Sequence, residues 1–139
     1  MARGPRRGPH TGDAFIADCP ARLAFDLFAH TWTSVVVYAL RDGPRRPAEL
    51  RAVIGGISAK ALTETLHRLE DSGLVLRRAY AEAPPRVDYE LTAAGRSLLD
   101  PILALGAWTD EYGDDVLRAR DRAEDRRAAA HPAGRRAAR

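Results

Sequence analysis

The sequence predicts a mainly α-helical domain with a small β-hairpin wing, the winged helix-turn-helix fold. Leucines recur at helical spacing in residues 59–71, and Gly55-Gly56 joins that segment to a shorter amphipathic segment before it. After Gly73 the hydrophobic period changes from that of a helix to that of a strand, and a second strand-like run follows at residues 86–91. A helix pair followed by a hairpin suits a domain that places one helix on DNA.

The composition divides the chain into three regions. Residues 1–12 are rich in Arg, Gly and Pro and predict a disordered basic arm. Residues 13–117 carry the periodic segments and are expected to form the folded domain, including its N- and C-terminal helices. Residues 118–139 form an Arg/Ala-rich C-terminal tail. Composition leaves two interpretations of the basic arm open, a phosphate-contacting segment and a solvated tail.

Three short helices are expected at the start of the folded domain. Cys19-Pro20 opens the first, because proline suits the first helical position, and the helix continues to His30. The second spans residues 33–41 and the third residues 47–54. The expected core contacts are Trp32, Val36, Val37 and Leu40 for the second helix, and Leu50, Val53 and Ile54 for the third.

Residues 59–71 are expected to form the DNA-recognition helix. Ser58 is a suitable N-cap, since its hydroxyl can accept a hydrogen bond from a free backbone N–H of the first turn. Gly73 can take the left-handed conformation that ends a helix. The apolar stripe consists of Leu62, Leu66 and Leu69. The side chains expected on the outer side are Lys60, Thr63, Glu64, Thr65, His67 and Arg68.

The first turns of this helix are the expected base-reading part, because side chains near the N-terminus of a recognition helix usually reach base edges. Lys60, Thr63, Glu64 and His67 are placed for that role. Glu64 could accept from a cytosine amino group, and Lys60 could donate to guanine or to a phosphate. For any single residue, the alternative is an ordinary exposed helix face beside a charged hairpin.

The hairpin is expected to have strands at residues 74–81 and 86–91, joined by a tip that contains Pro84-Pro85. Alternate side chains of the first strand should face solvent. The arginines expected to contact phosphates or the minor groove are Arg68, Arg77, Arg78 and Arg86.

A long helix is expected after the hairpin, capped by Thr92. Pro101 either kinks this helix or follows Asp100 at the start of a second segment. Its apolar residues are Leu98, Leu99, Ile102, Leu105, Trp108, Tyr112 and Val116. This apolar surface is long for one buried helix in so small a domain, which indicates a subunit interface.

The net charge of +3 is unevenly distributed. Residues 41–86 carry nine basic and six acidic side chains, whereas residues 87–117 carry one basic and seven acidic ones. This arrangement suits a DNA-facing surface backed by a region that DNA repels. All but one of the 22 basic residues are Arg, which is typical of a GC-rich genome, so arginine content alone is weak evidence for nucleic-acid binding.

Several classes of function are excluded or disfavoured. The longest apolar run, residues 35–40, is far too short to cross a bilayer, and no apolar signal-peptide core follows the N-terminal arginines, so a cytoplasmic protein without a membrane partner is expected. The single cysteine excludes an intrachain disulfide and a cysteine-rich zinc site. The four histidines lack metal-site spacing, and no phosphate-binding glycine loop or nucleophile elbow occurs. We therefore expect a binding protein with no catalytic residue, metal or cofactor.

Short motifs occur in a characteristic order across residues 19–112. They are Cys19-Pro20, Trp32-Thr33, Asp42-Gly-Pro-Arg-Arg46, Glu49-Leu50-Arg51, Gly56-Ile-Ser58, Lys60, Leu62-Thr63, Leu69-Glu70, Gly73-Leu-Val75, Pro84-Pro-Arg-Val87, Tyr89, Leu91-Thr92, Gly95-Arg96 and Trp108. In these motifs the chain resembles the HxlR-type winged helix-turn-helix transcriptional regulators, relatives of the MarR-like group.

The resemblance implies a homodimer that binds double-stranded DNA. The first and last helices would form the dimer interface, with Leu23, Leu27, Ile102, Leu105, Trp108 and Tyr112 as its candidate residues. Each subunit would insert its recognition helix into one half of a dyad-symmetric operator, with half-sites about 34–36 Å apart or multiples of that. The candidate DNA-binding residues are Arg46, Ser58, Lys60, Thr63, Glu64, His67, Arg68, Arg77, Arg78 and Arg86.

Three positions depart from the family pattern. Thr31 stands where members usually carry a basic residue, Thr65 where an Arg is common, and Pro47 where an aromatic residue often occurs. Fewer basic contacts indicate a different operator, or a larger contribution from the wing and the tails.

Cys19 is the candidate redox-sensing residue. At the start of a helix, free N–H groups and the helix dipole favour a thiolate, and Arg22 adds to that effect. Several relatives of the resembled family sense oxidants or electrophiles through a cysteine at this position, whereas many others keep it without a known sensing role. With one cysteine per subunit, only an intersubunit or small-thiol disulfide can form.

Three hypotheses therefore share this fold. The first is a DNA-binding regulator that responds to oxidants or electrophiles through Cys19. The second is a regulator whose response is set by a small-molecule effector. The third is a winged-helix protein-interaction module without sequence-specific DNA binding.

Overall fold

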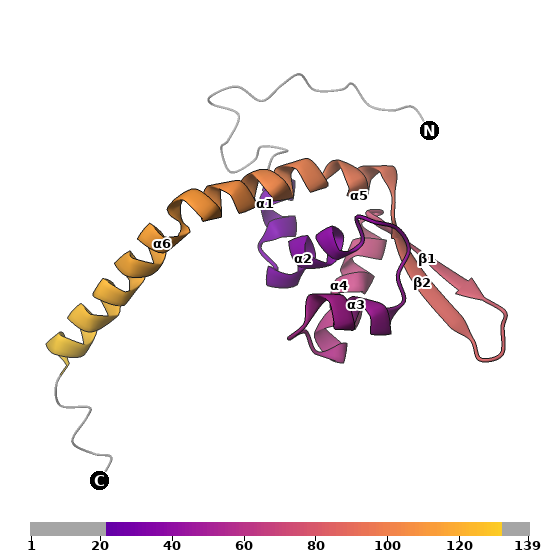
Figure 1. Ribbon diagram of the computed structural model, residues 1–139, viewed down its shortest axis with the longest axis horizontal. Coiled ribbons are helices and arrows are strands. Elements are labelled where there is room, and N and C mark those ends of the chain that lie inside the picture. Colours follow the sequence, from indigo (N-terminus) through magenta and orange to yellow (C-terminus); the bar gives the residue numbers. More distant parts are fainter. Residues whose placement is uncertain (1–21, 132–139) are drawn as a thin grey trace, which may run out of the picture. The chain divides into compact units, whose positions relative to one another are not determined.

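The computed structural model describes residues 22–131 of the chain, which fall into two units, one ending at Leu99 and one beginning at Asp100. The basic arm at 1–12 and Cys19 lie outside the described residues. The elements are α1 (Arg22–Phe28), α2 (Thr31–Ala39), α3 (Pro47–Ile54), α4 (Ala59–Asp71), β1 (Val75–Tyr80), β2 (Arg86–Leu91), α5 (Ala93–Ser97) and α6 (Leu99–Ala130) (Figure 1). The predicted mainly α fold with a hairpin wing is confirmed.

The core of the first unit lies between α2, α3 and α4. α2 is helical although three successive valines favour a strand, because Val36 and Val37 are completely buried. It begins and ends two residues earlier than expected, and Leu40 is its C-cap. The buried side chains are Thr33, Val36, Val37, Ala39, Leu40, Leu50, Ile57, Leu62, Thr65, Leu66, Leu69, Leu74, Val75, Tyr89 and Leu91.

Two expected core residues are less buried than the sequence indicates. Trp32 is only half-buried, and Val53 is 51% exposed. Val53 lines an open hollow between α2 and α3 together with Val35 and Tyr38, both of which are also partly exposed. The apolar face of α3 is therefore wider than the surface that α2 and α4 cover.

The bounds of α3 and α4 agree with the sequence prediction. Gly55 and Gly56, which join them, both have positive φ, at 66° and 72°, a conformation that favours glycine. Gly73 ends the α4 segment with φ at 69°, and its N–H donates to Glu70 O. The helix-turn-helix geometry therefore depends on glycines at the turn between the helices and after the second one.

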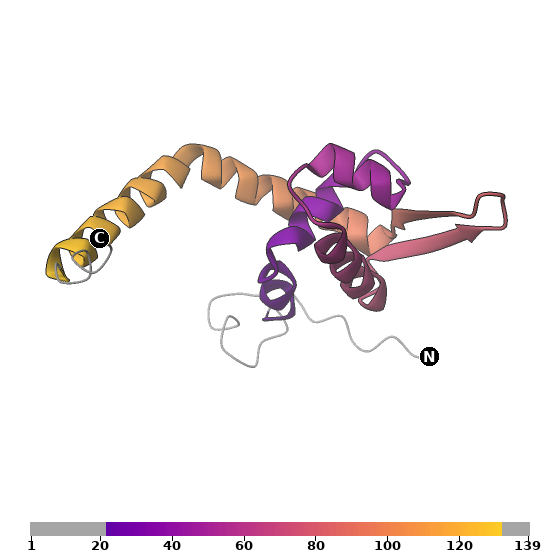
Figure 2. The ribbon, with the colours of Figure 1, turned by 90° about the horizontal axis from the view of Figure 1, so that it is seen from below.

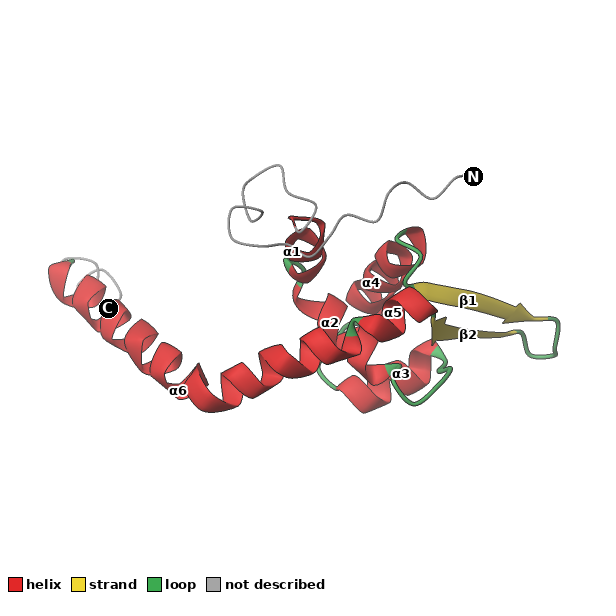
Figure 3. Cartoon of the chain, turned by 90° about the horizontal axis from the view of Figure 1, so that it is seen from above, coloured by secondary structure: helices red, strands yellow, loops and turns green. Residues whose placement is uncertain are grey.

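β1 and β2 pair as an antiparallel hairpin, with β1 one residue shorter at each end than expected and β2 as predicted. Arg45, in the loop before α3, adds a bridge to the second strand: Arg45 N donates to Tyr89 O at 3.0 Å, and Tyr89 N donates to Arg45 O at 2.9 Å. The base of the wing is thus tied to the helical core, while the rest of the hairpin projects away from the helices of this unit (Figure 2; Figure 3).

The long helix expected after the hairpin is two helices. Thr92 caps α5 as predicted, accepting from Gly95 N at 3.1 Å and donating to Gly73 O at 2.7 Å. The break falls at Leu98, and Pro101 lies in the first turn of α6, where its missing N–H is tolerated.

Almost all of α6 belongs to the second unit, which begins at its second residue, Asp100. It continues to Ala130 and so crosses residue 117, where the folded domain was expected to end. The division into a folded domain at residues 13–117 and a tail at residues 118–139 therefore stays a prediction. Within the described residues, no helix combines the length and apolar character that a membrane span requires.

Candidate nucleic-acid interface

α4 separates a buried face from an exposed polar one. Ser58 Oγ accepts from Ala61 N at 3.0 Å and so caps the helix, as predicted, while the residue itself is exposed. The three leucines of the predicted stripe are at most 2% exposed. The other side of the helix is exposed from its first turn to its middle, and it carries Lys60, Thr63, Glu64 and His67. The structure thus brings the four expected base-reading side chains onto one face.

The exposed side chains of α4 are held only weakly by the protein. Lys60 Nζ lies 3.9 Å from Glu64 Oε1, with the two side chains 86% and 57% exposed. An exposed helix pair of this spacing is worth about 0.3–0.5 kcal/mol. Thr63 Oγ1 donates to Ala59 O at 2.9 Å, which leaves its lone pairs available as acceptors. These groups can therefore exchange their contacts for a ligand at little cost.

The prediction that Thr65 lies on the outer face is wrong. Its side chain is 1% exposed; Oγ1 donates to Ala61 O at 2.8 Å and accepts from Arg68 Nη2 at 3.2 Å. The neighbouring Leu62 and Leu66 are buried on the same side, and the hydroxyl is satisfied within the helix, so threonine fits this core position. Thr65 therefore cannot contact a DNA base.

Arg68 lies at the edge of the exposed face rather than on it. It is half-buried, its Nη2 donates to Thr65, and its Nε is buried without a hydrogen-bond partner among the described residues. It also lines an open hollow between α1, α2 and α4. The guanidinium of Arg68 is thus partly engaged by the protein and less available to a phosphate than that of an exposed arginine.

The wing presents its three arginines in different ways. Arg77 is exposed and takes part in no ion pair within the described residues. Arg78 Nη2 lies 3.1 Å from Glu90 Oε2. Arg86 stacks over the Tyr80 ring at 4.1 Å, and its Nη2 lies 3.8 Å from Glu82 Oε1. Arg77 is therefore the wing arginine most available to a phosphate.

Arg46, the remaining predicted contact, lies at the N-cap of α3. Its backbone N–H donates to Glu49 Oε1 at 3.1 Å, and its Nε lies 3.8 Å from the same oxygen. The side chain is 54% exposed, so it remains accessible at the start of the helix-turn-helix. Arg51 of α3 is also exposed; it belongs to the Glu49-Leu50-Arg51 motif but was not among the candidate DNA-binding residues.

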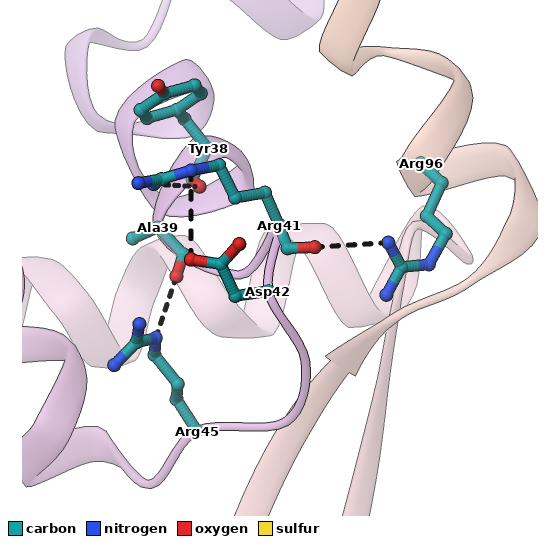
Figure 4. A network of polar contacts seen from close by, with 6 residues as sticks. All are labelled: Tyr38, Ala39, Arg41, Asp42, Arg45 and Arg96. Carbon is teal, nitrogen blue, oxygen red and sulfur yellow. Dashed lines mark hydrogen bonds and ion pairs between the residues drawn. The ribbon is translucent and has the colours of Figure 1, made fainter.

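Three further arginines that the candidate set omitted gather at the end of α2 (Figure 4). Arg41 Nη1 donates to Tyr38 O at 3.0 Å, Arg45 Nε to Ala39 O at 2.9 Å, and Arg96 Nη1 to Arg41 O at 3.2 Å. Arg41 also stacks over the Tyr38 ring at 4.1 Å. They satisfy carbonyls at and just beyond the C-terminus of α2, which is a structural use of positive charge.

The described residues hold no cluster of His, Cys, Asp or Glu that could bind a metal ion. The acidic pairs on α6 at 110–111 and 114–115 are mostly exposed, consistent with a solvated face. The described residues thus present an exposed polar surface on α4 and the wing that is suited to binding.

Comparison with known proteins agrees with this geometry. The model of the HxlR-like helix-turn-helix family matches residues 27–116. The HTH-type transcriptional regulator YtfH of Escherichia coli is 36% identical over 110 residues, which cover 79% of this chain and 87% of YtfH.

Two solved structures are also similar to this chain. The reduced form of the transcriptional regulator YodB from B. subtilis is 36% identical with a TM-score of 0.61, covering 68% of this chain and 93% of YodB. The redox regulator HypR in its oxidized form is 33% identical with a TM-score of 0.62, covering 67% of this chain and 96% of HypR. The chain therefore belongs to the HxlR-like helix-turn-helix family and is a transcriptional regulator, not an enzyme.

Proposed function

We propose that this regulator binds double-stranded DNA sequence-specifically as a homodimer on a dyad-symmetric operator. The observation that carries the proposal is the division of α4 into a fully buried leucine face and an exposed face with Lys60, Thr63, Glu64 and His67. An exposed polar helix of this length fits the major groove, whose width is about 12 Å. The base contacts would come from α4, and phosphate contacts from the wing and the N-terminus of α3.

Exposed apolar side chains on the terminal helices support the homodimer. On α6, Leu105, Trp108 and Tyr112 are 55%, 52% and 45% exposed, and the Trp108 and Tyr112 rings lie 5.9 Å apart. On α1, Leu23 is 68% exposed and Leu27 is half-buried. Large exposed apolar groups that share one helix face typically mark an interface, and a second copy would cover them.

A contrast between α4 and wing variants tests the DNA-binding proposal. The double variant Lys60→Ala/His67→Ala should bind the DNA upstream of its own gene about tenfold or more weakly than the wild type does. Its binding to a mixed-sequence duplex should change less, because base contacts carry specificity. Arg77→Ala should weaken binding to both duplexes alike and lower the salt slope by about one, because it removes a phosphate contact. Fluorescence anisotropy between about 50 and 200 mM salt measures both quantities.

Each variant serves as the control for the other. If both change the two duplexes in the same proportion, α4 does not read sequence. If the wild-type protein binds every duplex equally and weakly, the protein-interaction module becomes the better description of this fold.

We further propose that the regulator responds to oxidants or electrophiles through Cys19. The proposal is supported by the relatives: HypR is described as a redox regulator, and YodB has a reduced form. Diamide should release wild-type protein from its operator but not Cys19→Ser, and gel mobility shifts with and without a reductant measure the difference. Equal release of both proteins by diamide would contradict the thiol mechanism.

A small-molecule effector is the second candidate, because an open hollow of about 250 Å³ lies between α1, α2 and α4. Leu23, Leu27 and Leu69 contribute apolar walls, and Arg68 and His30 contribute polar groups. A ligand there would contact the end of α4 and could bias its position on DNA. If Cys19→Ser still responds to the physiological signal, this hypothesis is favoured over the thiol.

A further inference from the structure

The charges of the wing cancel. Residues 75–91 contain three arginines and three acids, so this segment has no net positive charge although it is expected to approach DNA. The acids are Glu82, Asp88 and Glu90. A hairpin that served only to grip phosphates would not need a carboxylate for each guanidinium.

The strand register places two of these acids beside Arg78. Arg78 pairs across the hairpin with Asp88, and Leu76 pairs with Glu90, so Glu90 is the diagonal neighbour of Arg78 on the same face. The Arg78–Glu90 ion pair has an N–O distance of 3.1 Å, with side chains 50% and 29% exposed. Arg77 pairs across the hairpin with Tyr89 and therefore lies on the opposite face from both acids.

The buried carboxylate oxygen of Glu90 has Arg78 as its counter-charge. Asp88 Oδ1 and Glu90 Oε2 are buried from solvent, and neither has a hydrogen-bond partner among the described residues. A carboxylate oxygen that is withdrawn from water is stabilised by a nearby cation and destabilised when that cation leaves. If Arg78 moved to a phosphate, Glu90 Oε2 would lose its counter-charge while the negatively charged DNA lay close to it.

We propose that Glu90 restrains Arg78 in an ion pair that competes with DNA phosphates, and so lowers affinity for DNA of any sequence. Glu90 then sets the overall affinity and its salt dependence and leaves the ratio of operator binding to non-specific binding unchanged, because a phosphate contact raises both alike. The inference rests on the proposed DNA-binding function, to which it adds an ion pair in the wing that lowers the affinity for DNA.

Glu90→Gln tests the restraint with little change in side-chain size. We expect the variant to bind a mixed-sequence duplex about threefold more tightly than wild type, the scale of one partly exposed ion pair. The salt slope should steepen by about 0.9, because Arg78 becomes free to neutralise one more phosphate. Fluorescence anisotropy at several salt concentrations measures both, and thermal unfolding monitored by circular dichroism verifies that the variant is folded.

A double-mutant cycle separates the restraint from a general charge effect. The gain from Glu90→Gln should disappear in the Arg78→Ala background, because no guanidinium remains to be released. Glu70→Gln is the matched control: it removes the same charge from an exposed residue of α4 that has no ion pair among the described residues. The effect of Glu70→Gln should therefore be the same with and without the Arg78→Ala substitution.

The outcomes are distinct. Weaker or unchanged DNA binding by Glu90→Gln would overturn the proposal, because Glu90 would then orient Arg78 for DNA or play no part. An equal gain with and without Arg78→Ala would also overturn it. Failure of wild-type protein to bind its upstream region or the mixed-sequence duplex would instead refute the DNA-binding function, and the inference would fall with it.

Discussion

Trp108→Asp should convert the protein to monomers and reduce its affinity for a two-half-site operator by about 100-fold or more. Trp108 is 52% exposed beside Tyr112 on α6, and a carboxylate there would have to be buried without a partner if a second copy covered this surface. A dimer that binds two half-sites gains the second contact at high effective concentration, and a monomer loses that gain. Analytical ultracentrifugation and anisotropy on the same samples measure the two effects.

Ala107→Asp is the matched control for this substitution. It introduces the same side chain one residue earlier, at an exposed position outside the face formed by Leu105, Trp108 and Tyr112. It should leave both the dimer and DNA binding nearly unchanged. A Trp108→Asp protein that sediments as the wild type does would contradict the assignment of this face to the dimer interface.

Gly95→Ala should be among the most destabilising single substitutions in the domain. A Cβ at Gly95 would overlap Leu74 O, a backbone atom that already accepts from Thr92 N at 3.0 Å. The clash cannot be relieved by rotating a side chain, so the hairpin must shift relative to α5. We expect the free energy of unfolding to fall by about 3 kcal/mol and Tm by more than about 10 °C, as thermal unfolding followed by circular dichroism would measure.

Gly106→Ala shows what the same substitution does without the clash. A Cβ at Gly106 meets nothing within 4 Å, and the residue lies inside α6. Alanine is favoured over glycine in a helix by about 0.5–1 kcal/mol, so this variant should be neutral or slightly stabilised in thermal unfolding. A Gly95→Ala protein that melts at the wild-type temperature would show that α5 does not approach Leu74 this closely.

Local patterns in the sequence determined much of the fold. Helical spacing and the Ser58 cap predict α4 at its observed bounds, and the change of period after Gly73 predicts the hairpin. These signals are local: a cap, a glycine with positive φ and an apolar repeat act within one element. The ordered motifs also identified the family, which the comparisons confirm over residues 27–116.

Only the tertiary structure decided which polar side chains remain available. The helical repeat already places Thr65, three residues after Leu62, beside the leucine stripe, whereas Arg68 lies off that stripe and is half-buried by its surroundings in the structure. Arg77 and Arg78 are adjacent and chemically identical in the sequence, yet the register gives Arg78 an acidic partner and leaves Arg77 without one in the described chain. The apolar repeat indicates which face of a helix is buried, but which individual charged side chains meet across the hairpin depends on its register and on the folded positions of those side chains.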